Sequence, residues 1–261
     1  MDKVILTLNK LTFNYGNNRV LNNISLDFEK GKFYGVLGPN GCGKTTLLDI
    51  IIKYKVPVSG NIKIKNKCIK EYSNEEIAKT VSIVPQDFYI NFPFTVESII
   101  WMGRYPYIPR FSSPGEENKE IVDRVIEDLE LCDLRNKLIT KLSGGEKQRV
   151  VFARAIAQNT PILLIDEGTS NMDIRHSIYI LNYVKNLVKD YGKTIIAVFH
   201  NLNLASLYCD NLVFIKNGHI IASGKTEKVF CKEIIEDTFD VKCHIYGESS
   251  TGKKQMIWSI Q

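Results

Sequence analysis

The chain has 261 residues, of which 44% are hydrophobic and 24% charged, so it can bury a substantial core as an ordinary globular protein. Its net charge of +5 is only mildly basic and falls short of the charge typical of a dedicated nucleic-acid binder. No apolar run approaches the ~18–20 residues that a membrane-spanning helix needs, and the first residues lack a signal peptide's apolar block. We therefore expect a cytoplasmic protein.

The first third of the chain predicts short strands around a glycine-rich loop. Strands are expected at residues 4–8, 24–28 and 33–37, and the last of these leads into the loop. A helix follows the loop, because its apolar residues recur at helical spacing: Leu47, Leu48, Ile51 and Ile52. Two further strands are predicted at 61–65, where polar and apolar residues alternate, and at 80–84.

The stretch from residue 88 to 159 has a different, helical character. Its first half is punctuated by prolines, and its longest periodic run places one set of apolar residues on a single helix face: Ile121, Val122, Val125, Ile126 and Leu129. A second helix follows a Ser-Gly-Gly step and runs through Ala157.

The alternation of strands and helices resumes at Pro161. Residues 162–165 and 195–199 are almost wholly apolar, which is typical of parallel strands covered on both faces. A helix is predicted between them, at 174–190.

The last part of the chain predicts a hairpin and a short tail. Residues 212–215 and 219–222 read as its two strands, with Asn217-Gly218 at the turn. The tail beyond Lys225 predicts two short helical stretches and a final strand-like piece.

Residues 38–46 fit the phosphate-loop pattern Gly-x-x-x-x-Gly-Lys-[Ser/Thr]. In such a loop the backbone N–H groups cradle phosphates, the lysine reaches the β- and γ-oxygens and the hydroxyl ligates Mg²⁺. The expected nucleotide-binding residues are Gly38, Pro39, Asn40, Gly41, Cys42, Gly43, Lys44, Thr45 and Thr46. Cys42 lies beside Lys44 and a helix N-terminus, which favour a reactive thiolate unless the side chain points inward.

The six cysteines are scattered along the chain, without a Cys-x-x-Cys pair or clustered histidines. We interpret them as reduced thiols and expect neither a disulfide framework nor a zinc site.

The step Ser143-Gly144-Gly145, followed by Glu146, opens a second helix with an exposed N-terminus. Its glycines let a backbone approach an anion closely, so this segment predicts a second anion site. The presence of a phosphate loop and a second anion site in one chain calls for an explanation that accounts for both.

These two motifs and five others stand in the order found in the ATP-binding-cassette family, which the chain resembles along nearly its whole length. Tyr15 resembles the aromatic residue that stacks on adenine, Gln86 the Q-loop glutamine and His200 the switch histidine. Residues 162–167 resemble the Walker B strand, and residues 170–173 the D-loop.

The resemblance implies an α/β fold, with a RecA-like P-loop NTPase core, an antiparallel β subdomain and an inserted α-helical subdomain. Residues 1–261 would form a single domain of this type. Within it, 1–87 and 160–225 would be the nucleotide-binding core, 88–159 the helical subdomain and 226–261 a C-terminal extension.

The resemblance also implies an ATPase that uses ATP and Mg²⁺. Glu167 would polarise the attacking water, His200 would contact the γ-phosphate, and Lys44 and Gln86 would complete the catalytic set. The implied metal ligands are Thr45, Gln86 and, through water, Asp166. The implied contacts to a second copy's nucleotide are Ser143, Gly144, Gly145 and Glu146, with Asp173 in the D-loop.

Each of these residues also has a structural interpretation. Glu167 could cap a helix or form an ion pair, His200 could be a structural strand-end histidine, and Gln86 an ordinary turn residue. Tyr15 could belong to the core, with Phe13 as the stacking residue in its place.

At three positions the residue differs from the one that is commonest in the family's motifs. Glu146 replaces a glutamine, Gly168 stands where proline is common, and Asn201 stands where aspartate is common. None of them removes an essential group, so activity is still expected.

The segment 92–107 carries the indication of a transported substrate. Its Thr-Val pair and its later Gly-Arg-Tyr-Pro are similar to those of ATPases that power uptake of iron–siderophore complexes, haem and cobalamin, and residues 200–205 resemble the same subgroup. We expect an iron(III)–siderophore importer, with cobalamin, haem or another metal chelate as alternatives. Tyr105 and Pro106 could instead only shape a loop.

The implied partners are a second copy of the chain, integral membrane permease subunits and, indirectly, a substrate-binding protein, but no nucleic acid. The location would be peripheral, on the cytoplasmic face of the cell membrane. Gln86 and the aromatic-rich stretch 88–107 would receive the permease, although Ile99, Ile100 and Trp101 could fill the core of the helical subdomain. The alternative class is a cassette protein outside transport, such as one acting on an assembly scaffold.

Overall fold

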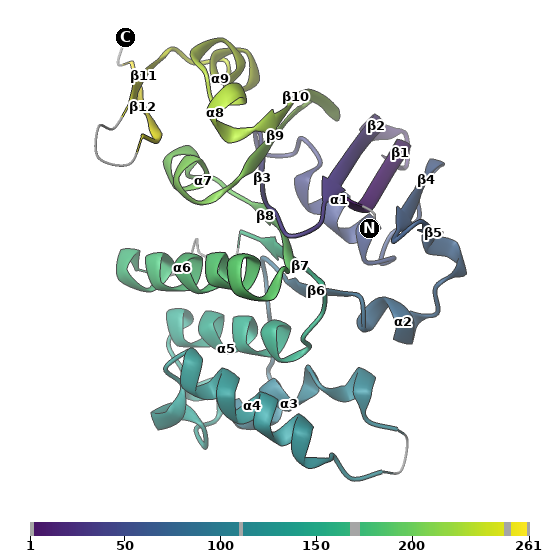
Figure 1. Cartoon of the computed structure of the whole chain (residues 1–261), viewed down its shortest axis with the longest axis vertical. Coiled ribbons are helices and arrows are strands. Elements are labelled where there is room, and N and C mark those ends of the chain that lie inside the picture. The colour runs from purple at the N-terminus through teal and green to yellow at the C-terminus, as the bar shows by residue number, and fades with distance from the viewer. Residues whose placement is uncertain (1–2, 110–111, 168–172, 248–251, 260–261) are drawn as a thin grey trace. The chain divides into compact units, whose positions relative to one another are not determined.

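The computed structural model describes residues 3–109, 112–167, 173–247 and 252–259, and Figure 1 labels its helices and strands. The chain divides into two compact units. One contains Met1–Tyr72 and Lys185–Gln261, and the other contains Ser73–Val184.

An antiparallel sheet opens the first unit, with strands in the order β2-β1-β4-β5. Its strands are β1 (Val4–Tyr15), β2 (Asn18–Glu29), β4 (Ser59–Ile64) and β5 (Lys67–Cys68). It is followed by a short 3₁₀ turn, Ile69–Glu71.

The first two strands are much longer than the predicted 4–8 and 24–28. They pair with each other nearly end to end, but the register shifts at several points. Lys10 (φ 50°) and Asn23 (φ 55°) have left-handed backbones, and their N–H groups donate to Ser25 Oγ and Thr12 Oγ1. Such bulges interrupt the two-residue period, so the sequence pattern ends before the strands do.

Around the phosphate loop, the first unit contains parallel strands. Strand β3 (Phe33–Leu37) lies between β8 (Thr194–Val198) and β9 (Asn211–Lys216) and is parallel to both. All residues of β3 and β8 are buried. For β8 the burial was predicted from the continuous apolar run at 195–199. The helices that follow β3 and β8 are α1 (Lys44–Ile51) and α7 (Leu202–Tyr208).

The predicted hairpin is confirmed. Strand β10 (His219–Lys225) pairs antiparallel with β9 through a turn at Asn217 (φ 49°) and Gly218 (φ 75°). Positive φ at both turn residues is what a two-residue type I′ hairpin requires, and Asn-Gly adopts it at low cost.

The C-terminal segment contains the two expected helices, α8 (Thr226–Val229) and α9 (Lys232–Phe239). The predicted single strand-like piece is in fact an antiparallel pair, β11 (Cys243–Gly247) and β12 (Lys254–Trp258). Both strands are visible at the C-terminal end of the ribbon in Figure 1.

The second unit is mainly helical. It contains one parallel strand pair, β6 (Val81–Val84) with β7 (Ile162–Asp166). Its helices are α2 (Asn74–Ala78), α3 (Val96–Met102), α4 (Glu116–Asp128) and α5 (Gly144–Ala157), and α6 (Ile174–Tyr191) begins there. Short 3₁₀ turns occur at Tyr105–Tyr107, Cys132–Leu134 and Ile139–Lys141. Val122, Val125 and Ile126 form the buried face of α4, as the sequence predicted.

In the part of the chain that the structure describes, no helix combines the length and the apolar composition needed to cross a bilayer.

Candidate functional site

The phosphate loop, residues 38–46, connects the buried strand β3 to helix α1. At two positions of the loop only glycine fits, because neighbouring atoms leave no room for a Cβ and because φ is positive. A Cβ on Gly38 (φ 157°) would lie 2.0 Å from the carbonyl oxygen of Ile215, and one on Gly43 (φ 105°) would lie 2.6 Å from Leu21 Cδ2. A Cβ on Gly41 would meet no heavy atom within 4 Å. The loop is therefore packed from behind at Gly38 and Gly43 and open at Gly41.

Lys44 is held inside this loop. Its ammonium donates to the carbonyl oxygens of Gly38 at 2.8 Å and Pro39 at 2.9 Å, and the residue is only 5% exposed. Gly43, at the N-cap of α1, has no side chain to cap the helix. The N–H groups at the start of a helix have no partner within it, and together with the helix dipole they favour an anion.

The two threonines after Lys44 differ in exposure. Thr45 is exposed, whereas Thr46 is buried, and the Thr46 hydroxyl lies 3.5 Å from the Tyr15 hydroxyl. Thr45 thus presents an exposed hydroxyl on the first turn of α1.

Tyr15 ends β1 and is 49% exposed, whereas Phe13 is 8% exposed. The two rings contact each other edge to face, with centroids 5.0 Å apart. Of these two candidates for adenine stacking, the exposed Tyr15 is therefore favoured. The buried ring of Phe13 packs against it.

In the second unit, the carboxylates of the Walker B segment follow the buried strand β7. Asp166 is 3% exposed, and Glu167 adopts a left-handed backbone with φ 52°. The side-chain amide of Gln86, which follows β6, donates to Glu167 Oε2 at 2.7 Å. Since β6 and β7 are parallel neighbours, their carboxyl ends bring these two polar side chains together.

The signature segment, residues 143–146, forms the N-terminus of α5. Ser143 is the N-cap: its hydroxyl accepts from the Glu146 N–H at 3.3 Å, and Glu146 Oε2 accepts from the Ser143 N–H at 2.7 Å. The backbone hydrogen bond from Ser143 lowers the pKa of Glu146. Glu146 therefore has a capping role that the sequence analysis missed, although the pattern Ser-x-x-Glu signals it.

Asp173 precedes α6 and binds its first turn. Its carboxylate accepts from the His176 N–H at 2.8 Å and contacts His176 Nδ1, and these hydrogen bonds lower the pKa of Asp173. His176 was not singled out from the sequence. Gly168 and the other D-loop residues, 170–172, lie outside the described residues.

His200 is an exposed residue just after β8 in the first unit. The next residue, Asn201, is the N-cap of α7, and its side chain accepts from the Leu204 N–H at 3.1 Å. Asparagine and aspartate cap helices about equally well, so asparagine in place of the family's common aspartate preserves the local structure.

Cys42 corrects one expectation. It is 5% exposed, and burial raises the pKa of its thiol despite the opposing effect of Lys44. A Cβ on Gly38 would lie 2.7 Å from the Cys42 sulfur, so the thiol packs into the base of the loop. A reactive thiolate was therefore the wrong alternative here, because the Cys42 thiol is buried and its pKa is raised. All six cysteines are free thiols.

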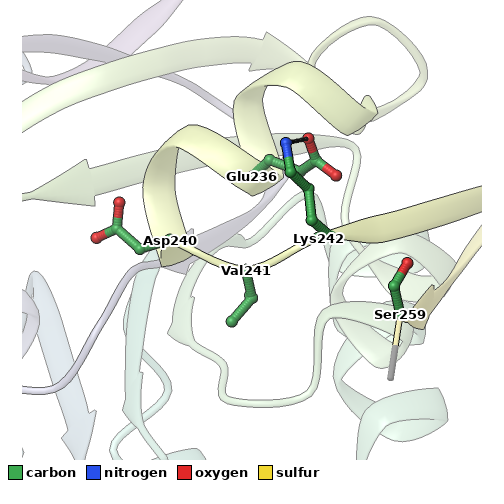
Figure 2. Close-up of a pocket in the computed structure, with 5 residues that line it drawn as sticks. All are labelled: Glu236, Asp240, Val241, Lys242 and Ser259. Atoms are coloured by element: carbon green, nitrogen blue, oxygen red, sulfur yellow. Dashed lines mark hydrogen bonds and ion pairs between the residues drawn. The ribbon is translucent and has the colours of Figure 1, made fainter. Parts of the chain in front are cut away.

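A separate hollow of about 470 Å³ lies in the C-terminal segment, lined by Glu236, Asp240, Val241, Lys242 and Ser259. Figure 2 shows Glu236 and Lys242 paired with each other, and the Asp240 carboxylate accepts from Lys216 at 2.8 Å. Because its charged groups are already paired, this hollow offers no candidate chemistry. The described residues contain no cluster of three or more His, Cys, Asp or Glu that could hold a metal ion.

Comparison with known protein families shows which family the chain belongs to. The family model described as "ABC transporter" matches residues 21–170, which is more than half of the chain. The chain belongs to the ABC transporter family. The phosphate loop and the signature segment both lie within the matched region.

Curated ABC transporter relatives resemble the chain over most of its length. It is 37% identical to YvrA, an uncharacterised ABC transporter ATP-binding protein of Bacillus subtilis, over 95% of the chain and 56% of the relative. It is 32% identical to the ferric enterobactin transport ATP-binding protein FepC of Escherichia coli, over 93% of the chain and 90% of the relative. It is 33% identical to the cobalamin import ATP-binding protein BtuD of Halobacterium salinarum, over 90% of the chain and 58% of the relative. The chain thus spans little more than half of two of these relatives.

Solved structures confirm the predicted fold class. A structure described as a metal-chelate type ABC transporter in an inward-facing conformation superposes with a TM-score of 0.85, at 25% identity, covering 99% of this chain and 98% of the other. A bacterial ABC transporter cassette solved as a dimer superposes with a TM-score of 0.77, at 28% identity, covering 85% and 99%. The P-loop NTPase core with its antiparallel and helical parts is therefore the fold of an ABC ATPase.

Proposed function

We propose that this chain is the ATP-hydrolysing subunit of an importer of iron(III)–siderophore complexes. The observation that carries the proposed ATP hydrolysis is Glu167, just after β7, whose carboxylate accepts a hydrogen bond from Gln86 at 2.7 Å. A second support is the phosphate loop, with its open Gly41 and its buried Lys44. An ATPase needs both a phosphate cradle and a positioned general base.

Each residue has a role in this proposal. Lys44 and the N–H groups at the start of α1 bind the β- and γ-phosphates, and Tyr15 stacks on adenine. Glu167 orients the attacking water and accepts its proton, while Gln86 holds the Glu167 carboxylate. His200 contacts the γ-phosphate.

The side-chain chemistry of the proposed ligands suits a magnesium ion. Thr45 offers an exposed hydroxyl on the first turn of α1, and Asp166 offers a buried carboxylate at the end of β7. Oxygen ligands of this kind are those that Mg²⁺ prefers, and Gln86 would supply a third. When bound, Mg²⁺ neutralises charge on the phosphate oxygens.

A second copy of the chain completes the ATPase in this proposal. Ser143 and Gly144 are exposed, and a Cβ on either Gly144 or Gly145 would meet no heavy atom within 4 Å. This open backbone suits close approach to the nucleotide of the second copy, and Asp173 of the D-loop would contact the same copy. The dimeric form of the related cassette supports this arrangement.

The proposed substrate rests on relatives. FepC is named for ferric enterobactin transport, and it is matched over nearly all of its length. Cobalamin import is the second candidate, favoured by the resemblance to BtuD, of which the chain covers 58%.

A membrane permease is the proposed partner, and the chain would associate with it peripherally on the cytoplasmic face of the membrane. Its docking surface would be the exposed aromatic side chains after Gln86: Tyr89 (83% exposed), Phe92 (64%) and Tyr105 (61%). Exposed aromatics of this kind concentrate at interfaces. By contrast, Ile99 and Ile100 are fully buried in α3 and would fill the hydrophobic core of the helical part.

We propose the following division of the chain. Residues 88–159 form the helical subdomain, 1–87 and 160–225 form the nucleotide-binding core, and 226–261 form the C-terminal extension.

The test is uptake by cells that lack their own importer ATPase and express this chain with its permease. We expect restored uptake of labelled iron(III)–siderophore, and none with the Lys44→Ala variant, which serves as the control. If only cobalamin uptake is restored, the substrate is cobalamin and not an iron–siderophore complex. If the unmutated chain hydrolyses no ATP in the presence of the permease, the proposed function is wrong.

A further inference from the structure

The loop that follows α1 carries a lysine that contacts the proposed adenine-stacking tyrosine. Lys55 forms an ion pair with Asp49, whose side chain is only 16% exposed, near the end of α1. Its ammonium also lies 5.3 Å from the centroid of the Tyr15 ring and 5.3 Å from that of Tyr54. One cation thus joins α1 to two aromatic rings.

The backbone of this loop is fixed to the same helix. The N–H groups of Tyr54 and Lys55 both donate to the carbonyl oxygen of Asp49, at 2.9 Å and 3.2 Å. The Lys55 side chain is 23% exposed. Its position is therefore set by α1, from both the backbone and the side chain, rather than by solvent.

Tyr15 is linked to α1 directly through Thr46 and indirectly through Lys55, which pairs with Asp49 on the helix. Its hydroxyl lies 3.5 Å from Thr46 Oγ1 on the first turn, and Lys55 lies over its ring. Hydrogen bonding from Lys55 first, and then from Thr46, lowers the pKa of Tyr15. Tyr15 ends its strand, and Gly16 turns away with φ 56°, so these tethers replace the support that a strand interior would give.

We propose that Lys55, anchored by Asp49, is a positioning residue that holds the Tyr15 ring at a fixed place relative to the phosphate loop. The inference deepens the proposed function and rests on it. Because α1 begins at the phosphate loop, the tether sets the distance between a base on Tyr15 and phosphates at the start of α1. Half of Tyr15 stays exposed, which leaves ring surface for the base.

The ammonium itself is not placed as a phosphate ligand. It is engaged by the Asp49 carboxylate and by two aromatic rings. Removing it should therefore weaken base binding by freeing the Tyr15 side chain, and leave phosphate binding unchanged. Ordering one such side chain, together with one exposed cation–π contact, corresponds to about a threefold to tenfold change in affinity.

The test measures binding of ATP and of inorganic tripolyphosphate, which has no base, to the full chain by calorimetry. Lys55→Met keeps the length of the side chain and removes its charge. We expect its ATP affinity to fall about threefold to tenfold and its tripolyphosphate affinity to stay at the unmutated value. Lys55→Arg should restore ATP binding.

The matched control is Lys53→Met in the same loop. The Lys53 ammonium donates to the Tyr72 carbonyl oxygen at 2.7 Å, so its loss should leave ATP affinity unchanged. Asp49→Asn should weaken ATP binding, and the double variant with Lys55→Met should weaken it no further, because both changes release the same tether.

The outcomes separate this inference from the proposed function. Unchanged ATP affinity in Lys55→Met, or an equal loss of tripolyphosphate binding, overturns the positioning role. If Tyr15→Ala binds ATP as well as the unmutated chain, the base does not lie on Tyr15, and the inference fails while ATP binding stands. If the unmutated chain binds neither ligand, the proposed function fails as well.

Discussion

Gln86 donates its side-chain amide to the carboxylate of Glu167 at 2.7 Å, although the two residues lie far apart in the chain. Parallel pairing of β6 with β7 brings the ends of both strands together. Glu167 also has a left-handed backbone, a conformation that costs about 1–3 kcal/mol for a residue other than glycine. Strand pairing, the backbone turn and one hydrogen bond thus fix the direction of a single carboxylate.

Replacing that carboxylate should separate hydrolysis from binding. Glu167→Gln should bind ATP and lose about 10²–10⁴-fold in hydrolysis rate, because it cannot accept a proton from water. Lys44→Ala should lose nucleotide binding instead. Phosphate release and equilibrium titration measure the two effects, and a Glu167→Gln rate close to the unmutated one would contradict the assignment.

The same variant should reveal the dimer. With hydrolysis blocked, ATP and Mg²⁺ should hold two copies together through the signature segment, doubling the mass seen by light scattering. Adding Gly144→Asp, which places a side chain and a negative charge on the open backbone, should return the protein to a monomer. A Glu167→Gln chain that stays monomeric at high concentration, even with its permease, would count against the second anion site.

Cys42 should react slowly with thiol reagents. Its pKa is raised by burial, and the thiol is packed inside the loop, so iodoacetamide at pH 8 should modify exposed Cys132 well before Cys42. Peptide mass mapping over time gives both rates, with the urea-unfolded chain as the reference in which the two rates should converge. Faster modification of Cys42 than of Cys132 in the folded protein would show that the thiol is accessible.

Lys193 should make stability depend on pH. Burial lowers its pKa from 10.5 to about 8, so between these values the unfolded chain binds more protons than the folded one. By linkage, the contribution of Lys193 to the free energy of unfolding is lowest below pH 8 and rises as pH increases towards 10.5.

Urea unfolding at several pH values tests this. Lys193→Met should raise the free energy of unfolding at pH 7 and remove the rise above pH 8, because no buried charge remains to be lost. Exposed Lys189→Met is the matched control and should preserve the rise. If the free energy of unfolding still rises above pH 8 in Lys193→Met, the rise comes from the titration of another group.

The exposed aromatics should couple hydrolysis to transport. Phe92→Ala or Tyr105→Ala should abolish uptake of the iron chelate while the ATPase activity of the isolated chain persists, because each side chain is more than half exposed and its loss leaves the core intact. Tyr191→Ala, an equally exposed tyrosine at the end of α6, is the control and should transport normally. Unchanged uptake in both test variants would remove this surface from the proposed interface.

Local chemistry was enough to predict several parts of this protein. The phosphate loop follows from the spacing of its glycines and Lys44, and the hairpin follows from Asn217-Gly218, where both backbones have positive φ. The buried strands β7 and β8 follow from continuous apolar runs. In each case the cause lies within a few residues of the chain, so the sequence shows it directly.

Tertiary structure decided the rest, because those properties depend on residues far apart in the chain. Bulges in the β1–β2 pair hide the strand period, so the sequence could not show where those strands end. The Cys42 thiol is buried by packing rather than activated by its neighbours. The Lys55 tether to Tyr15 depends on a loop that folds back over α1. Sequence patterns specify backbone conformation here, whereas burial and the direction of each side chain come from contacts made only in the folded chain.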